Sequence, residues 1–443
     1  MAATETGADA QAPRDVAMGT GSWARAKAIL GGSAGNLVEW YDWFAYSSFA
    51  LYFAPHFFPK GDQTAQLLQA AAVFAVGFLA RPVGAWAMGL YADRAGRRTA
   101  LMVAVLMMCV GSLVIALMPT YAQIGAFAPA GLLLARVLQG LSVGGEYGAS
   151  ATYMSEVAGK TRRGFWSSFQ FVTMIMGQLV AIAILLLLQA TLSPEDLDAW
   201  GWRIPFLIGG VMAVVVFWIR RGLKETKSYT ASKEAGHERA HTMMLFRNHP
   251  RETAITFGLT AGGSLAFYAY TTYMQKFLVN TTGFAKTTAT GIIAAGLVTF
   301  MLALPLIGWL SDKFSRKATL IFCFGCGAAF TYPLMSAISR VDNAFAAYLM
   351  VTALMIIISG YSAVSAAVKS ELFPANVRAL GVALPYATAN AVFGGTAEYA
   401  ALWFKQQNHE NYFYIYVSVM MAVSLSIGLR LRNTNRTSLI LED

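Results

Sequence analysis

Long apolar runs recur along the whole chain, and shorter polar segments separate them. Each run approaches or exceeds the roughly twenty apolar residues that a helix needs to cross the hydrocarbon core of a bilayer. The pattern therefore predicts an all-α membrane protein with twelve transmembrane helices. We expect them near residues 30–54, 66–91, 100–119, 128–155, 165–190, 203–221, 253–278, 287–310, 318–338, 345–370, 379–403 and 411–431.

A long polar segment divides these spans into two sets of six. The first residues are rich in Ala, Thr and Gly and lack the basic start and apolar core of a signal peptide. We expect a disordered tail at 1–27, a six-helix half at 28–221, a linker at 222–251, a second half at 252–432 and a tail at 433–443.

The distribution of charged residues predicts how the chain is oriented in the membrane. Only 13% of the residues are charged and 56% are hydrophobic, whereas a soluble domain is about 25% charged. The net charge of +10 would suggest nucleic acid, but most Lys and Arg residues lie at alternate span ends. This distribution predicts a multi-pass protein with both termini in the cytoplasm, bound to lipid and not to nucleic acid.

Few residues are available for enzyme chemistry. Cys109, Cys323 and Cys326 all lie in apolar segments, and the C-x-x-C pair has no further metal ligand nearby. The five histidines fall in loops or at span edges, so the sequence offers no cluster of nucleophile, base or metal ligands. We expect no enzyme activity, no metal and no cofactor, with protons as the coupling ion of a carrier.

Two loop motifs occur twice, at nearly constant spacing. GLYADRAGRR (89–98) follows the second span and GWLSDKFSRK (308–317) the eighth. SEVAGKTRRG (155–164) follows the fourth span and SELFPANVRALG (370–381) the tenth. Internal duplication with six spans per half is typical of secondary transporters, whose site lies near the bilayer midplane between the halves.

The first of these motifs, G-x-x-x-D-R-x-G-R-R, resembles the signature of the major facilitator superfamily, and its second copy has Ser315 where Gly is usual. Further segments resemble its metabolite:proton symporter family: GNLVEWYDW (35–43), FLARPVGAW (78–86), ARVLQGLSVGGEYGASATYMSE (135–156) and WGWRIPF (200–206). That family carries small carboxylates and betaines inward with protons. The resemblance implies a major facilitator fold in the cytoplasmic membrane.

Segments 267–283 and 383–402 are most similar to family members that carry α-ketoglutarate. The resemblance therefore implies proton symport of α-ketoglutarate by a monomer. Citrate, another dicarboxylate, shikimate and proline or betaine remain alternative substrates, and a non-transporting sensor with the same fold remains an alternative function.

In this superfamily the repeated loops form a network that holds the cytoplasmic side closed. An ordinary positive-inside loop is the alternative interpretation. The resemblance implies that the conformational latch comprises Gly89, Asp93, Arg94, Gly96, Arg97, Arg98, Asp312, Arg316, Glu156, Arg162, Glu371 and Arg378.

Glu39 and Asp42 lie in the middle of the first span. A charged residue at the bilayer centre costs about 2.5–3.5 kcal/mol, so these carboxylates require buried cations or a proton path. Asp42 with Arg136 of the fourth span resembles the proton-sensing pair of proton-linked sugar porters. We assign proton coupling to Asp42 and Arg136, followed by Glu39. A permanent structural ion pair is the alternative.

A dianionic substrate needs buried cations or hydrogen-bond donors. Arg81 is the first candidate because a guanidinium can hold a carboxylate with two hydrogen bonds. Lys276, with Tyr273 beside it, is the candidate for the second carboxylate, although a lysine near a span end can also snorkel. Lys369 is interpreted as an ordinary residue near an inner span end, and Glu146 and Glu398 have no assigned role.

Four neutral residues complete the predicted site, each of which can instead serve packing alone. Their positions line the central cavity in this superfamily, where they would donate or accept hydrogen bonds. They are Gln178, Tyr268, Tyr386 and Asn390.

Overall fold

The computed structural model describes residues 22–95, 97–143, 151–152, 154–155, 158, 162–221, 242–374, 377–432, 434 and 438. These residues are nearly all helical, and a helix lies at each of the twelve predicted spans. Six helices are long and apolar enough to cross a membrane by length and composition alone. The prediction of an all-α fold with membrane-spanning helices is confirmed.

The first half consists of six main helices, one of which is made of two segments. Short helices connect some of them: α4 (Tyr121–Ile124), α9 (Pro194–Ala199) and η1 (Gly201–Arg203). The main helices are α1 (Ser22–Phe57), α2 (Gln63–Ala95), α3 (Arg97–Leu117), α5 (Phe127–Val143), α7 (Arg163–Ser167) with α8 (Phe169–Thr191), and α10 (Ile204–Arg221).

In the second half, two helices are interrupted by π-helical turns. The first is α13 (Pro250–Tyr268), η2 (Ala269–Tyr273) and α14 (Met274–Asn280). The second is α18 (Arg378–Ala389), η3 (Asn390–Gly394) and α19 (Ala397–Gln406). The remaining helices are α15 (Lys286–Lys313), α16 (Arg316–Ile338), α17 (Ala344–Leu372) and α20 (Glu410–Arg430).

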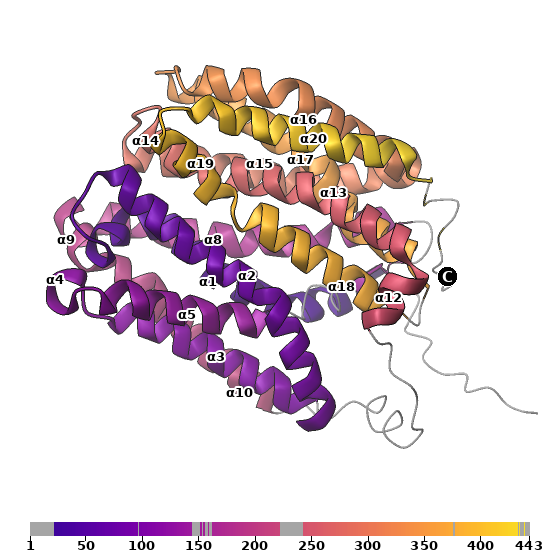
Figure 1. Cartoon of the computed structure of the whole chain (residues 1–443), viewed down its shortest axis with the longest axis horizontal. Helices are drawn as coiled ribbons and strands as arrows, with labels where there is room; N and C mark the ends of the chain where they lie inside the picture. The colour runs from indigo at the N-terminus through magenta and orange to yellow at the C-terminus, as the bar shows by residue number, and fades with distance from the viewer. Residues whose placement is uncertain are drawn as a thin grey trace, which may run out of the picture.

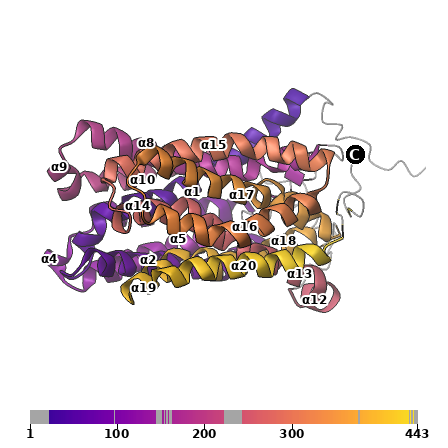
Figure 2. The same cartoon turned by 90° about the horizontal axis from the view of Figure 1, so that it is seen from above.

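The main helices run along the long axis of the molecule, so the bundle has two ends (Figures 1 and 2). We call the end with α12 (Thr242–Asn248) and the end of α20 the tail end, and the end with α4, α9 and α14 the loop end. Two boundaries differ from the prediction: α1 begins at Ser22, inside the expected tail, and α12 lies in the expected linker. Leu245 of α12 is fully buried in a cluster with Phe373.

The two halves meet along two matched seams. On one side α2 packs against α18, η3 and α19, and on the other α8 packs against α15, which lies beside it in both views (Figures 1 and 2). The spacing of the duplicated motifs relates α2 to α15 and α8 to α18–α19. The two seams are therefore equivalent by internal symmetry, which places the interior between the halves near the symmetry axis.

Helix α1 contributes a long buried segment to this interior. Every residue from Glu39 to Ala54 is buried, although the outward faces of other helices carry exposed apolar side chains such as Leu106, Leu134 and Trp218. Exposed apolar surface of this kind suits contact with lipid. The polar residues between Glu39 and Ala54 accordingly lie among protein side chains and not toward the bilayer.

Candidate functional site: buried charges between two halves

Arg81 lies in the middle of α2 and is 5% exposed. Its guanidinium carbon lies 3.8 Å from the ring centroid of Phe78, 4.0 Å from Trp43 and 4.9 Å from Trp40. Its Nε and Nη2 atoms have no hydrogen-bond partner among the residues that the structure describes. A buried cation with unused donors is costly, and an anionic ligand would satisfy both needs.

The second half completes the surroundings of Arg81. Tyr268 and Tyr386 lie near enough to interact with its charge, and the Tyr268 ring packs edge-on against Phe78 at 5.3 Å. The Tyr268 side chain lies within hydrogen-bonding reach of Asn390 and Arg81. The structure thus brings four predicted residues together at the seam between the halves.

Gln178 lies in the same interface, on α8. Its Nε2 donates to the carbonyl of Thr271 in η2 at 3.2 Å, whereas its Oε1 has no partner among the described residues. It therefore contacts the opposite half, as a residue lining a shared cavity would.

Lys369 lies in the last turn of α17, yet its side chain is buried. Its Nζ donates to the Tyr361 hydroxyl at 3.0 Å and lies 4.4 Å from the centroid of the Tyr386 ring. Side chains on a helix lean toward its N-terminus, and for α17 that direction leads into the bundle. The predicted position near the inner end of the span is thus confirmed, whereas the burial of the side chain was not predicted.

Lys276 is fully buried and does not snorkel. Its Nζ lies 2.9 Å from Glu398 Oε2 in α19 and donates to Ser47 Oγ in α1 at 2.6 Å. Glu398, which the sequence left without a role, is therefore the partner of a predicted substrate ligand. Tyr273 donates instead to Glu410 of α20 at 3.3 Å, toward the loop end.

Asp42 and Arg136 form the buried ion pair that the sequence suggested, with 3.2 Å between Oδ2 and Nη1. The Ser112 hydroxyl also donates to Asp42, and Arg136 donates to Gln139 at 2.6 Å. The contact is confirmed, while its role in proton coupling stays a prediction. Glu39 is 4% exposed and interacts with the charge of Arg81.

At the tail end, Asp312 links the two halves. Its carboxylate accepts hydrogen bonds from the backbone N–H groups of Gly164 at 2.7 Å and Phe165 at 2.8 Å, and it pairs with Arg316 at 2.8 Å. Unpaired N–H groups at a helix start attract a carboxylate, and these two open α7. The second copy of the motif thus joins the halves, as a latch would.

Glu371 adds a second link at this end. It accepts from Arg316 at 2.8 Å and from Arg163 at 3.1 Å. Arg163 was not predicted; the candidate Arg162 beside it is exposed. Arg378 donates to the carbonyl of Phe373 at 3.1 Å, within its own half.

The predicted latch residues of the first half lie outside the residues whose side chains the structure describes, and so does the unassigned Glu146. These latch residues are Gly89, Asp93, Arg94, Gly96, Arg97, Arg98 and Glu156.

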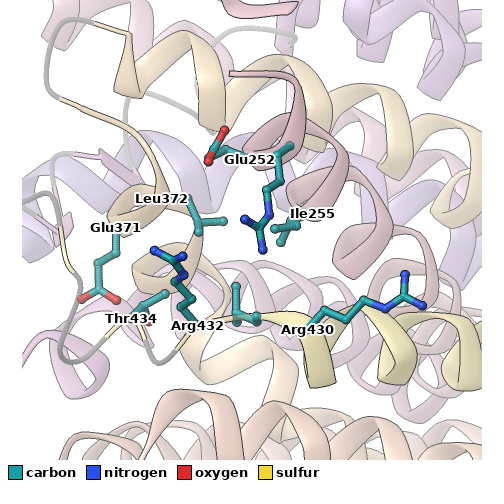
Figure 3. Close-up of a pocket in the computed structure, with 9 residues that line it drawn as sticks. Glu252, Ile255, Glu371, Leu372, Arg430, Arg432 and Thr434 are labelled. Carbon is teal, nitrogen blue, oxygen red and sulfur yellow. The ribbon is translucent and has the colours of Figure 1, made fainter. Parts of the chain in front are cut away.

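A pocket of about 200 Å³ opens beside Glu371 at the tail end (Figure 3). All of its lining residues belong to the second half or follow α20, so the pocket does not lie between the halves. It is therefore separate from the Arg81 site. The lining residues are Arg251, Glu252, Ile255, Glu371, Leu372, Arg430, Leu431, Arg432 and Thr434.

The halves are also joined at the loop end. Lys286 of α15 pairs with Asp198 of α9 at 3.0 Å, and Asn280 donates to Thr64 at 3.2 Å. Gln189 of α8 donates to Thr290 of α15 at 3.3 Å. Contacts at both ends enclose the buried charges, which describes an occluded conformation.

Two matched six-helix halves that enclose buried charges and close at both ends define a secondary active transporter of the membrane. The sequences of known proteins agree. The chain belongs to the sugar (and other) transporter family of the major facilitator superfamily, which matches residues 28–254 and 234–441.

Curated relatives cover most of the chain. It is 54% identical to the alpha-ketoglutarate permease of Escherichia coli (strain K12), over 87% of this chain and 89% of that one. It is 34% identical to the citrate-proton symporter of Klebsiella pneumoniae, over 85% of each chain. Among solved structures, the partially occluded inward-open xylose transporter XylE of E. coli superposes with a TM-score of 0.73 at 18% identity, over 92% of this chain and 97% of that one.

Proposed function

We propose that this protein takes up α-ketoglutarate together with protons, by exposing its interior site alternately to the two sides of the membrane. The buried Arg81 carries the proposal, because its unused N–H groups face the seam between the halves. The names of the 54%-identical permease and of the citrate-proton symporter support a carboxylate substrate and a proton gradient as the driving force.

In this mechanism, one substrate carboxylate binds Arg81 through two parallel hydrogen bonds. The hydroxyls of Tyr268 and Tyr386 and the amides of Gln178 and Asn390 supply neutral hydrogen bonds around it. Arg81 and Gln178 belong to the first half, and the other three residues belong to the second. Binding therefore stabilises the state in which the halves are closed on the substrate.

Asp42 serves as a proton carrier in the same cycle. Its pairing with Arg136 stabilises the carboxylate, and separation of α1 from α5 would favour the neutral acid because the site is buried. A proton would bind when the pair is parted and leave when it re-forms. This coupling is needed, since each negative charge entering against 100 mV costs about 2.3 kcal/mol.

The distribution of Lys and Arg supports an orientation with the tail end in the cytoplasm. The loop end then faces the outside of the cytoplasmic membrane. A single chain contains both halves and both seams, and we propose that it works as a monomer.

The test is uptake of labelled α-ketoglutarate into proteoliposomes with an imposed inward proton gradient. We expect accumulation that collapses with the gradient and is competed by unlabelled α-ketoglutarate, but not by citrate, shikimate or betaine. Gradient-driven uptake of another member of this panel would reassign the substrate. Absence of flux with every member would favour the sensor.

A further inference from the structure

Lys276, Glu398 and Ser47 form a buried cluster that joins the two halves. Lys276 and Glu398 belong to the second half, and Ser47 belongs to α1 of the first. The relative exposure of the three residues is 0%, 4% and 3%. The cluster therefore lies inside the interface through which a substrate must pass.

The position of the cluster relates it to Arg81. Ser47 lies one turn along α1 from Trp43, whose ring contacts the Arg81 guanidinium at 4.0 Å. Residues one turn apart have Cβ atoms roughly 6 Å apart. Two buried cations, Arg81 and Lys276, thus contact side chains that lie one turn apart on α1.

Glu398 occupies the place that a substrate carboxylate would need. In this occluded structure Lys276 already has one carboxylate, at 2.9 Å. Bringing a second carboxylate into the same buried site would leave an uncompensated negative charge, which is strongly unfavourable. The charge of Glu398 must therefore be removed before Lys276 can hold the substrate.

We propose that Glu398 is a second proton-binding group of the transport cycle, and that its protonation frees Lys276 to bind the second carboxylate of the substrate. The inference rests on the proposed function and deepens it.

The step balances in charge and atoms. From the outer side, one Glu398 oxygen takes a proton from water and the ion pair with Lys276 is lost. The Lys276 ammonium then pairs with the entering carboxylate. On the inner side the substrate leaves, Glu398 returns its proton to water, and the pair with Lys276 re-forms. One proton thus accompanies one substrate charge at this site, in addition to the proton assigned to Asp42.

Other titratable groups also face Glu398. Tyr46 of α1 and Tyr273 of η2 interact with its charge. Helices α2 and α20 both pack against α19, which holds Glu398. Within the described part of α2, Arg81 is the buried charged side chain. On α20, Glu410 pairs with Lys405 at 3.5 Å. Because the tyrosines are neutral in the ordinary pH range and Glu410 has its own cation, Lys276 is the principal partner of Glu398.

The decisive measurement is the proton-to-substrate ratio, obtained from the voltage at which net α-ketoglutarate flux stops under fixed gradients. Glu398→Gln mimics the protonated acid permanently. We expect this variant to transport with one proton fewer per substrate than the wild type, and to keep counterflow exchange. Glu410→Gln removes the carboxylate of another Lys–Glu pair of the second half, and we expect it to keep the wild-type ratio.

An unchanged ratio in Glu398→Gln would overturn the inference while leaving α-ketoglutarate symport intact. Failure of the wild type to accumulate α-ketoglutarate would instead contradict the proposed function. These two failures are therefore distinguishable in one assay.

A binding measurement covers the case in which Glu398→Gln does not fold. Calorimetry of α-ketoglutarate binding in buffers of different ionisation enthalpy counts the protons taken up. In Lys276→Met, Glu398 has no lysine to release to the substrate, so we expect one proton fewer than in the wild type and affinity at least tenfold weaker. The same proton count in both proteins would contradict the assignment.

Discussion

At the scale of single residues, Asp42 is held by Arg136 and Ser112 inside the first half. Asp42→Asn keeps the size of the side chain but cannot exchange a proton. We expect it to abolish accumulation of substrate against its gradient and to retain counterflow, which needs no net proton movement. Counterflow of labelled α-ketoglutarate, measured beside gradient-driven uptake, separates the two. Accumulation that survives would leave Asp42 a structural ion-pair partner.

A substitution at Arg81 tests the proposed substrate site itself. Arg81→Lys keeps the positive charge but loses the planar pair of donors, because an ammonium cannot hold a carboxylate with the same two-bond geometry. A hydrogen bond to a charged group contributes about 1.5–3 kcal/mol, so we expect roughly 10- to 150-fold weaker binding of α-ketoglutarate. Binding to the purified protein gives the affinity directly.

Arg203 provides the matched control for this variant. Its guanidinium also stacks on an aromatic ring, at 4.2 Å from the Trp202 centroid, but it donates to Met118 near the loop end. We expect Arg203→Lys to keep the wild-type affinity. Equal loss in both variants would mean that Arg81 stabilises the fold and does not bind substrate.

At the scale of helices, sequence reasoning succeeded where long apolar stretches dominate. Most spans were predicted to within a few residues of the main helices because burial and lipid contact both demand continuous apolar residues. The start of α1 and the end of α5 differ from the predicted bounds by more. The side-chain partners were harder. Lys369 reaches the interior through the lean of its helix, and Glu398 acquires its role from a contact with another helix. Neither depends on local sequence.

The close approach of α7 to α15 gives a prediction at the same scale. A Cβ on Gly164 would lie 2.7 Å from the carbonyl oxygen of Gly308 and 2.9 Å from Asp312. Overpacking costs about 1–3 kcal/mol, so Gly164→Ala should disfavour closure at the tail end by roughly 5- to 150-fold. We expect slower uptake with substrate affinity largely retained.

Gly291 of α15 is the control for this glycine, since a Cβ there meets nothing within 4 Å. Gly291→Ala should transport at the wild-type rate. Initial uptake rates, together with the affinity for α-ketoglutarate, decide the matter. A Gly164→Ala variant with unaltered rates would show that tail-end closure does not limit the cycle.

At the scale of the whole molecule, contacts between the halves lie at both ends of the described structure, on either side of the interior charges. Opening toward the outside must break the pair between Lys286 and Asp198. Replacing both by cysteine and joining the thiols with a reducible bifunctional thiol reagent, which spans more than a direct disulfide, should therefore stop uptake, and a reductant should restore it. Each single-cysteine variant should respond to neither reagent. Uptake that continues in the cross-linked double variant would place the opening movement elsewhere.

The internal duplication predicts the two halves of the molecule but not the individual side-chain contacts between them. The repeated motifs correctly predicted two six-helix halves, but they could not show that Arg163 and not Arg162 would meet Glu371. Neighbouring residues on a helix point in directions about 100° apart, so a one-residue choice depends on how the halves dock.

The π-helical turns η2 and η3 change the direction in which the following helical residues face, relative to the equivalent helices of the first half. Their counterparts in the first half by motif spacing, α1 and α8, are regular α-helices. One residue added to a turn rotates everything beyond it by about 100°. Lys276 and Glu398 both lie beyond such turns. Two copies of one ancestral helix pattern can therefore present different faces to the same interior, which lets a symmetric frame hold an asymmetric substrate.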